Sequence, residues 1–214
     1  MKGADVLRLF EHDLGNRIFK SDLVNCNIAT LQSIVSDWRA LGYTIVFTAG
    51  VFDILTINHL LGLYNYRLMG GPKTRLIVSI DTDERVRNSK AFKLHKGGSA
   101  KPILSWSSRA MMVAKQTFDN RGSLVDLIVQ HGSDTCGGMA CPHDDNVSIA
   151  EAIEPDIIPV TSTSIDTIRK INQSTRLDSK LMVIIDEETL AYNDALLGKK
   201  ISNSAIIERI RREG

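Results

Sequence analysis

The sequence has almost no excess of charge of either sign and no apolar run long enough to cross a membrane. Its 26 Lys and Arg residues nearly balance its 25 Asp and Glu residues, which leaves a formal net charge of +1. No long-range field that attracts nucleic acid or anionic lipid is therefore expected, so any anion binding must be local. The N-terminus has acidic residues among its apolar ones and does not resemble a signal peptide. We expect a cytoplasmic protein that binds neither nucleic acid nor membrane.

Cysteine is scarce as well. Cys26, Cys136 and Cys141 cannot all pair within one chain, and a chain of this size does not depend on disulfides, so reduced thiols are expected. An alternative is that Cys136 and Cys141 bind Zn²⁺ together with His131 and His143. The spacing of these four residues fits none of the common zinc-finger patterns, so zinc is the less favoured interpretation.

The length of 214 residues, 43% of them hydrophobic, is enough for one sizeable core and predicts a single domain over residues 1–214. Residues 1–21 are predicted to be an N-terminal extension. Residues 132–146 and 186–200 read as surface insertions.

Apolar segments with helical spacing alternate along the chain with short β-branched runs. This alternation predicts an α/β fold with a doubly wound, Rossmann-like parallel sheet. Helices are predicted over Asp22–Leu41, 59–69, Ser107–Phe118, Ser148–Ile153, Ile165–Ile171 and Ser204–Arg211. Strands are predicted over Thr44–Ala49, Arg75–Ile80, Leu124–Val129, Asp156–Val160 and Lys180–Ile185.

The loop after the first predicted strand is the first candidate site, because ligands of parallel sheets bind beyond the carboxyl ends of the strands. Residues 49–59 read AGVFDILTINH, in which Gly50 lets the backbone approach a phosphate and Thr56 is a good helix N-cap. His59 follows three residues later, so both side chains lie at one anion-binding helix end. A histidine there can donate to the oxygens of a transferring phosphoryl group, although plain capping explains the spacing equally well.

This segment resembles the G-x-F-D-x-x-[HT]-x-G-H signature of the cytidylyltransferase-like nucleotidyltransferases. Threonine at position 56 is also found in phosphopantetheine adenylyltransferases, whereas Asn58 stands where the family usually has glycine. The resemblance implies a HIGH-type nucleotidyltransferase fold in which His59 and Thr56 are catalytic. The implied nucleotide-binding residues of this segment are Ala49, Gly50, Val51, Phe52, Asp53 and Asn58.

A second segment, ISNSAIIERI at residues 201–210, is similar to the family's I-S-[ST]-[ST]-x-I-x-x-R-I motif and lies about 140 residues after the first. Ser202, Asn203 and Ser204 can cap a helix and, with its free N–H groups, hold the β- and γ-phosphates of an NTP. A plain capping role is the alternative. Two motifs in the family's order favour the phosphate role.

Between the two motifs, residues 76–84 resemble the family's second strand and its acidic turn, which includes Asp83. In the family a lysine after this strand contacts the phosphates. Lys90, Lys93 and Lys96 are all eligible: Lys96 precedes Gly97 as in the family's K-G pair, whereas Lys90 keeps the family's distance from the strand.

Residues 101–103, KPI, together with Arg109, resemble the family's R-P-[IV] and downstream arginine stretch. Arg109 is predicted to bind phosphate from the start of its helix, with a surface ion pair as the alternative. Trp106 is predicted either to stack on a base or sugar or to be partly buried in the core.

The resemblance is strongest to the heptose 1-phosphate adenylyltransferase domain, and glycerol-3-phosphate cytidylyltransferase is more distant. It implies transfer of a nucleoside monophosphate from ATP or CTP to a phosphorylated small molecule, with Mg²⁺ and with a possible homodimer. Residues 159–164, PVTSTS, depart from the family's G-G-D-Y type sequence. Two alternatives remain open: a noncatalytic nucleotide-binding module and a zinc-stabilised interaction protein.

Overall fold

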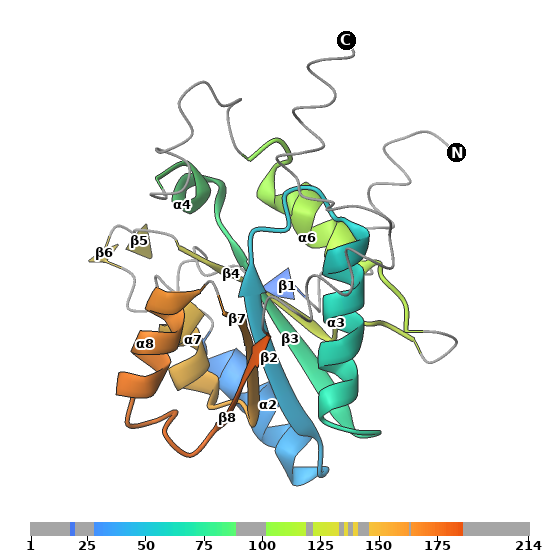
Figure 1. Ribbon diagram of the computed structural model, residues 1–214, viewed down its shortest axis with the longest axis vertical. Helices are drawn as coiled ribbons and strands as arrows, with labels where there is room; N and C mark the ends of the chain where they lie inside the picture. The colour runs from blue at the N-terminus through green and yellow to red at the C-terminus, as the bar shows by residue number, and fades with distance from the viewer. Residues whose placement is uncertain are drawn as a thin grey trace.

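The computed structural model describes residues 18–19, 28–88, 102–118, 122–132, 135–136, 139–140, 146–162 and 164–185. In these ranges helices and strands alternate along the chain (Figure 1). The strands are β1 (Ile18–Phe19), β2 (Thr44–Gly50), β3 (Thr74–Asp81), β4 (Leu127–His131), β5 (Thr135–Cys136), β6 (Met139–Ala140), β7 (Ile157–Thr161) and β8 (Leu181–Ile185). The helices are α2 (Ile28–Ala40), α3 (Ile57–Met69), α4 (Asp83–Asn88), α6 (Trp106–Ala114), α7 (Asn146–Ile153) and α8 (Ile165–Gln173).

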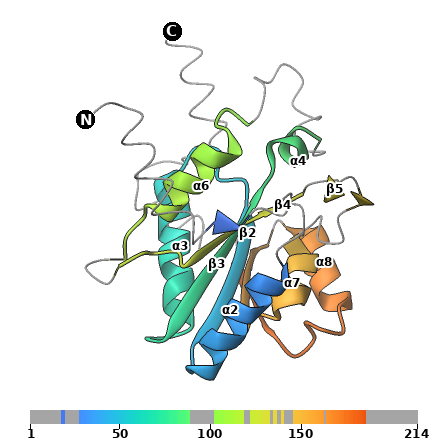
Figure 2. The same cartoon turned by 180° about the vertical axis from the view of Figure 1, so that it is seen from behind.

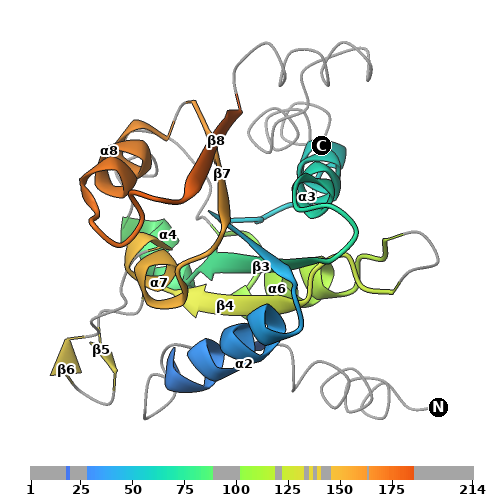
Figure 3. The same ribbon diagram turned by 90° about the horizontal axis from the view of Figure 1, so that it is seen from below.

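Six of these strands form one sheet in the order β1-β4-β3-β2-β7-β8, and every neighbouring pair is parallel. The chain runs from β2 through β3 to β4 on one side and then crosses to β7 and β8 on the other. The order of the strands therefore reverses between β2 and β7 (Figure 3). In open α/β sheets ligands bind at this switch point, outside the carboxyl ends of the strands.

Helices cover both faces of the sheet, α3 and α6 on one and α2, α7 and α8 on the other (Figures 1 and 2). The first face buries β-strand residues such as Val46 and Val78 against α3 and α6. The second face buries residues such as Ile45 and Ile77 against α2, α7 and α8. Successive strand residues thus enter opposite cores, which explains why the strands are almost continuously apolar. The predicted doubly wound α/β fold is confirmed.

Every predicted helix and strand that lies in the described residues is present, and an end is shifted by more than two residues in two of them. The helix predicted over Ser107–Phe118 ends at Ala114, because the chain turns back and Phe118 N–H donates to the carbonyl of Gly122. The strand predicted over Leu124–Val129 is found at Leu127–His131. The Asp126 carboxylate accepts the Leu76 N–H at 2.8 Å, where a ladder partner would otherwise bind, so pairing with β3 begins only afterwards.

Three features were not predicted from the sequence. The acidic turn after β3 is the helix α4, capped by Thr82, whose hydroxyl accepts the Arg85 N–H at 3.1 Å. Strand β1 pairs with β4 at the sheet edge. The hairpin of β5 and β6 lies inside the predicted insertion 132–146. The expected helix at 204–211 and the 186–200 insertion lie outside the described residues.

Candidate functional site

The strands on either side of the switch point separate at their carboxyl ends. β2 and β7 share a single register pair, Val46 with Ile157, whereas β2 pairs with β3 along its whole length. Beyond that pair a cavity of about 90 Å³ opens between them. It is lined by the ends of both strands and by α7 and α8, and the Tyr66 side chain reaches it from α3. Burial raises the pKa of Tyr66 above its ordinary value. The first-motif loop, residues 51–56 between β2 and α3, leaves β2 at this point.

The backbone of that loop is strained where it leaves β2. Phe52 has φ +52°, a left-handed conformation that a residue with a bulky side chain rarely adopts. Its ring is buried, and a Cβ at Gly50 would lie 3.0 Å from that ring. The sequence assigned Gly50 to close approach of a phosphate, but its immediate neighbour in the structure is Phe52. The Phe52 ring in turn lies 5.4 Å from the His59 ring, centroid to centroid.

Thr56 is the N-cap of α3, as predicted, and His59 folds back onto it. The Thr56 N–H donates to His59 Nδ1 at 3.1 Å, and the Thr56 hydroxyl lies 3.0 Å from the same nitrogen. Because a backbone N–H can only donate, Nδ1 must be an acceptor, and the neutral ring therefore carries its proton on Nε2. Burial lowers the pKa of His59, and a backbone hydrogen bond with Ile54 partly opposes this shift. The structure thus favours a neutral histidine at the start of a helix.

Asp53 joins the first-motif loop to the segment before α6. Its side chain is buried, and Oδ1 accepts the backbone N–H groups of Ile103 at 2.8 Å and Leu104 at 3.0 Å. Its Oδ2 is buried too and accepts no hydrogen bond from any residue in the described ranges. The carboxylate therefore fixes the 102–104 segment beside the loop and retains one unused acceptor.

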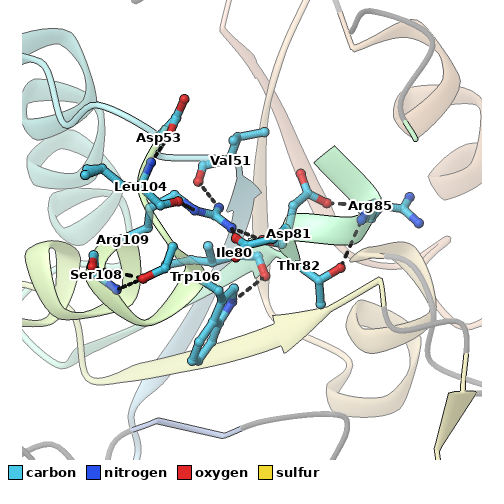
Figure 4. A network of polar contacts seen from close by, with 12 residues as sticks. Val51, Asp53, Ile80, Asp81, Thr82, Arg85, Leu104, Trp106, Ser108 and Arg109 are labelled. Atoms are coloured by element: carbon cyan, nitrogen blue, oxygen red, sulfur yellow. Dashed lines mark hydrogen bonds and ion pairs between the residues drawn. The ribbon is translucent and has the colours of Figure 1, made fainter. Parts of the chain in front are cut away.

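Arg109, on α6, binds the same loop through its guanidinium group (Figure 4). The side chain is fully buried, and Nη1 donates to the Val51 carbonyl at 2.5 Å. Nη2 donates to the Asp81 carbonyl and to Asp83 Oδ1, both at 2.7 Å, and Nε donates to the Leu104 carbonyl at 3.2 Å. The alternative of a surface ion pair is wrong, because the pair with Asp83 involves a buried guanidinium. Direct phosphate binding by Arg109 stays a prediction, and it would require an exchange of these partners.

At the end of β3 the Asp81 side chain meets His131 from β4. His131 Nε2 lies 2.7 Å from Asp81 Oδ1, and Nδ1 lies 2.7 Å from the Ser79 hydroxyl. Burial alone would raise the pKa of Asp81, but the hydrogen bond and charge of His131, with Arg85 and Arg109, outweigh it and lower that pKa. Sequence reasoning missed this network, because it considered His131 only in the less favoured zinc alternative.

Both ring nitrogens of His131 are engaged by these partners, which argues against the zinc alternative. Cys141 and His143 lie outside the described residues, and so does the side chain of Cys136. Within the ranges that the structure describes, no three His, Cys, Asp or Glu side chains are grouped as metal ligands.

The remaining predicted site residues lie near the first-motif loop, in the core, or outside the described residues. Asn58 is half-buried in the first turn of α3, and Ala49, the last residue but one of β2, lines the cavity. Trp106 is a core residue, since its ring is buried and Nε1 donates to the Ile80 carbonyl at 3.1 Å. The predictions for Lys90, Lys93, Lys96, Ser202, Asn203 and Ser204 lie outside the described residues.

The loop after β7, on the other side of the cavity, is organised locally. The Thr161 hydroxyl lies 2.8 Å from the Ser164 hydroxyl, and the Ser164 N–H donates to the Thr161 carbonyl at 2.9 Å. The Ser162 N–H donates to the carbonyl of Ile185 at the end of β8. This segment departs from the family sequence, and it borders the cavity through Thr161 and Ser164.

A parallel sheet whose strands separate at the switch point defines a doubly wound, Rossmann-like α/β protein, and the Thr56–His59 helix start lies beside the gap. The sequence relatives are more particular. The chain is 30% identical to the bifunctional protein HldE of Methylobacillus flagellatus over 133 residues, which are 62% of this chain and 22% of that protein. It is 31% identical to HldE of Wolinella succinogenes over 60% of the chain and 22% of the relative. HldE of Pasteurella multocida is 35% identical over 50% of the chain and 19% of the relative.

These relatives confirm the predicted resemblance to the heptose 1-phosphate adenylyltransferase domain, which HldE proteins include, and the prediction of an enzyme of this type agrees with it. The chain spans about a fifth of the length of these relatives. No family model matches the chain. Among solved structures, pantoate-beta-alanine ligase from Francisella tularensis aligns with a TM-score of 0.44 and 10% identity, covering 79% of this chain and 67% of that one. None of the described helices is both long and apolar enough to cross a membrane.

Proposed function

We propose that the chain transfers a nucleoside monophosphate from an NTP to a phosphorylated small molecule and releases pyrophosphate. The observation that carries the proposal is the pairing of Thr56 with a neutral His59 at the start of α3, beside the gap between β2 and β7. The positive end of the helix dipole favours an anion there, and Nε2 is the ring nitrogen that carries the proton to donate. The HldE relatives support the same reaction class.

In the proposed reaction an oxygen of the acceptor's phosphate attacks the α-phosphorus of the NTP. The bond from that phosphorus to the oxygen bridging the β-phosphorus breaks, and pyrophosphate leaves with both electrons of the bond. His59 and the backbone N–H groups at the start of α3 stabilise the charge that develops on the α-phosphate oxygens. No covalent enzyme intermediate is needed, because attack and departure occur at one phosphorus atom.

The pyrophosphate would be held by Ser202, Asn203 and Ser204, by one of Lys90, Lys93 and Lys96, and by Mg²⁺ that enters with the NTP. Mg²⁺ in such sites is usually held by one or two carboxylates together with the phosphates of the substrate. Magnesium supplies positive charge to the leaving group. Arg109 acts in this scheme by fixing the Val51 carbonyl and the 102–104 segment around the loop.

The acceptor is proposed to be a sugar phosphate of heptose 1-phosphate type, and glycerol 3-phosphate or another alcohol phosphate is the second choice. Both follow from the resemblance to HldE and to glycerol-3-phosphate cytidylyltransferase. The cavity of about 90 Å³ is smaller than the roughly 300 Å³ or more of most ligand sites, so it can take only part of the substrates.

The test is pyrophosphate release with Mg²⁺, with ATP and CTP offered separately against heptose 1-phosphate, glycerol 3-phosphate and other phosphorylated acceptors. His59→Ala is expected to lose turnover by about 100-fold or more, as removal of one charge-stabilising donor does elsewhere. Ile57→Ala, an exposed change in the same helical turn, is the matched control and should retain turnover. Near-normal release by folded His59→Ala protein would refute the role of His59.

A noncatalytic nucleotide-binding module is the second candidate. It is favoured by Asn58, which replaces the family's glycine, and by the loop from Thr161 to Ser164, which is closed on itself by its own hydroxyl groups. NTP binding without pyrophosphate release across the acceptor panel would support this candidate. Release that depends on one NTP, one acceptor and His59 would exclude it.

A further inference from the structure

A second pocket lies at the amino-terminal edge of the sheet, away from the first-motif loop. It has a volume of about 460 Å³, which is within the usual range for a small-molecule site. Its lining includes Arg67 from the end of α3, Gly71 from the turn before β3, Thr74 and Arg75 from β3, and the residues Tyr43 and Phe118. The eight residues of β3 separate this edge from the carboxyl edge by about 25 Å at 3.3 Å per residue.

The pocket has an excess of positive charge. Arg67 and Arg75 both bind the carboxylate of Asp126, Arg75 Nη1 at 2.6 Å from Oδ1 and Arg67 Nη1 to Oδ2. Asp126 Oδ2 also accepts the Leu76 N–H at 2.8 Å, so this one carboxylate serves three donors. Two guanidinium groups against one carboxylate leave a unit of positive charge in a partly desolvated groove, where an anion interacts more strongly than in water.

The guanidinium of Arg75 is held in a fixed orientation by two aromatic rings. Its guanidinium carbon lies 4.2 Å from the centroid of the Tyr43 ring and 5.2 Å from that of Trp38, so the group is fixed in orientation. Burial would lower the pKa of Arg75, but hydrogen bonds and charge interactions with Asp126 and, to a smaller extent, with Tyr43 outweigh this and raise it, so the charge persists at any ordinary pH. Its Nε–H is buried and has no hydrogen-bond partner among the described residues. Buried donors of this kind are rare without a water, an ion or a ligand.

We propose that this amino-edge pocket binds an organic phosphate that carries a flat apolar group. The phosphate oxygens accept from the guanidinium groups of Arg67 and Arg75, and the apolar group packs against Tyr43 and Phe118. Both arginines remain accessible to a ligand, with 16% of the Arg67 and 29% of the Arg75 side chain exposed. A structural clamp needs only one guanidinium for the single carboxylate of Asp126, whereas two are present beside an open pocket. The inference does not depend on the proposed nucleotidyl transfer.

The test is a titration of the full chain with phenyl phosphate, inorganic phosphate and benzoate, followed by nitrogen-proton NMR. The Arg75 Nε–H and the Gly71 and Thr74 amides report on this pocket, and the Gly50 and Val51 amides report on the carboxyl edge. Saturable shifts confined to the first group, with phenyl phosphate binding more tightly than inorganic phosphate, are expected. Benzoate should bind more weakly than phenyl phosphate if the doubly charged phosphate is the recognised group.

Arg67→Met should weaken phenyl phosphate binding by about tenfold or more, because a charged hydrogen bond is lost while the apolar stem remains. Arg169→Met removes an exposed arginine, paired only with Asp166 among the described residues, and is the matched control. If Arg67→Met fails to fold, Arg67→Lys keeps the charge with a single point donor and should still bind more weakly than the parent chain. Shifts that do not saturate, that saturate at the same ligand concentration in the Arg67→Met variant as in the parent chain, or that occur only at Gly50 and Val51 would overturn the proposal.

Discussion

The two sides of the gap at the switch point are organised differently. On the β2 side, charged and buried groups from distant segments hold the loop: Arg109 binds the Val51 carbonyl, and Asp53 binds the Ile103 and Leu104 N–H groups. On the β7 side, the loop is closed mainly by contacts of Thr161 with Ser164, three residues apart. The β2 side is thus fixed by several buried side chains from distant segments, whereas the β7 side has short-range contacts and a backbone hydrogen bond from Ser162 to Ile185.

This difference suggests that the two sides of the gap have different roles in the proposed reaction. A group that stabilises a transition state must be positioned before the reaction begins, so His59 belongs on the fixed side. The local loop on the β7 side can change its sequence without disturbing the core, as loops generally do. The departure of residues 159–164 from the family sequence is in keeping with a role in choosing the nucleotide rather than in transferring it.

The largest effect is expected from Arg109→Met. This change removes the donors to three carbonyl groups and leaves Asp83 without its buried partner, so the free energy of unfolding should fall by about 3–5 kcal/mol. Urea denaturation measures it. Arg169→Met, which breaks only an exposed pair with Asp166, should change stability by less than about 0.5 kcal/mol. A loss for Arg109→Met as small as that of the control would show that the β2 side is not held by this residue.

A smaller loss is expected from Asp53→Ala, which orphans the Ile103 and Leu104 N–H groups. Hydrogen bonds to a charged acceptor support a decrease of about 2–3 kcal/mol in the free energy of unfolding. Hydrogen exchange gives a more specific readout, because the amides of Ile103 and Leu104 should exchange faster in the variant. Asp178→Ala, at an exposed position, is the control. Unchanged protection of those two amides would contradict the role given to Asp53.

The sheet could be predicted from the sequence because a short β-branched apolar run is typical of a strand that is buried on both faces. The sequence was enough for Thr56 and His59 because an N-cap and a residue three positions on always meet in the first helical turn. It did not reveal that Arg109 is buried. The carbonyl groups that satisfy that residue come from positions 51, 81 and 104, which only the tertiary fold brings together.

The end of β4 was missed for a related reason. Gln130 and His131 are polar and seemed to end the strand, yet both are buried and the strand continues through them. For His131 the cause is visible, since Ser79 and Asp81 on the neighbouring strand satisfy both ring nitrogens. Polarity by itself is therefore a poor sign of a strand end when the next strand supplies hydrogen-bond partners.

The pH dependence of stability should show that His59 is neutral on the fixed side. Because burial lowers its pKa below the ordinary value of about 6.5, the unfolded chain binds more protons than the folded chain in that range. The contribution of neutral His59 to the free energy of unfolding is therefore fully present above pH 6.5. It is lost as the pH falls from 6.5 through the lowered pKa. Urea denaturation at pH 7.5 and 5.5 should show a smaller difference for His59→Asn than for the parent chain. Equal differences would mean that His59 does not titrate in this way.

The smallest effect is expected on the β7 side. Thr161→Val keeps the shape of the side chain but removes its hydroxyl from Ser164, so the free energy of unfolding should fall by only about 0.5–1 kcal/mol. The ratio of turnover with ATP to turnover with CTP should change clearly even though stability changes little, because this loop borders the gap without supporting the core. Pyrophosphate release with each nucleotide, compared with Arg169→Met, measures that ratio. A large loss of stability with an unchanged ratio would show that the two sides of the gap do not divide the work.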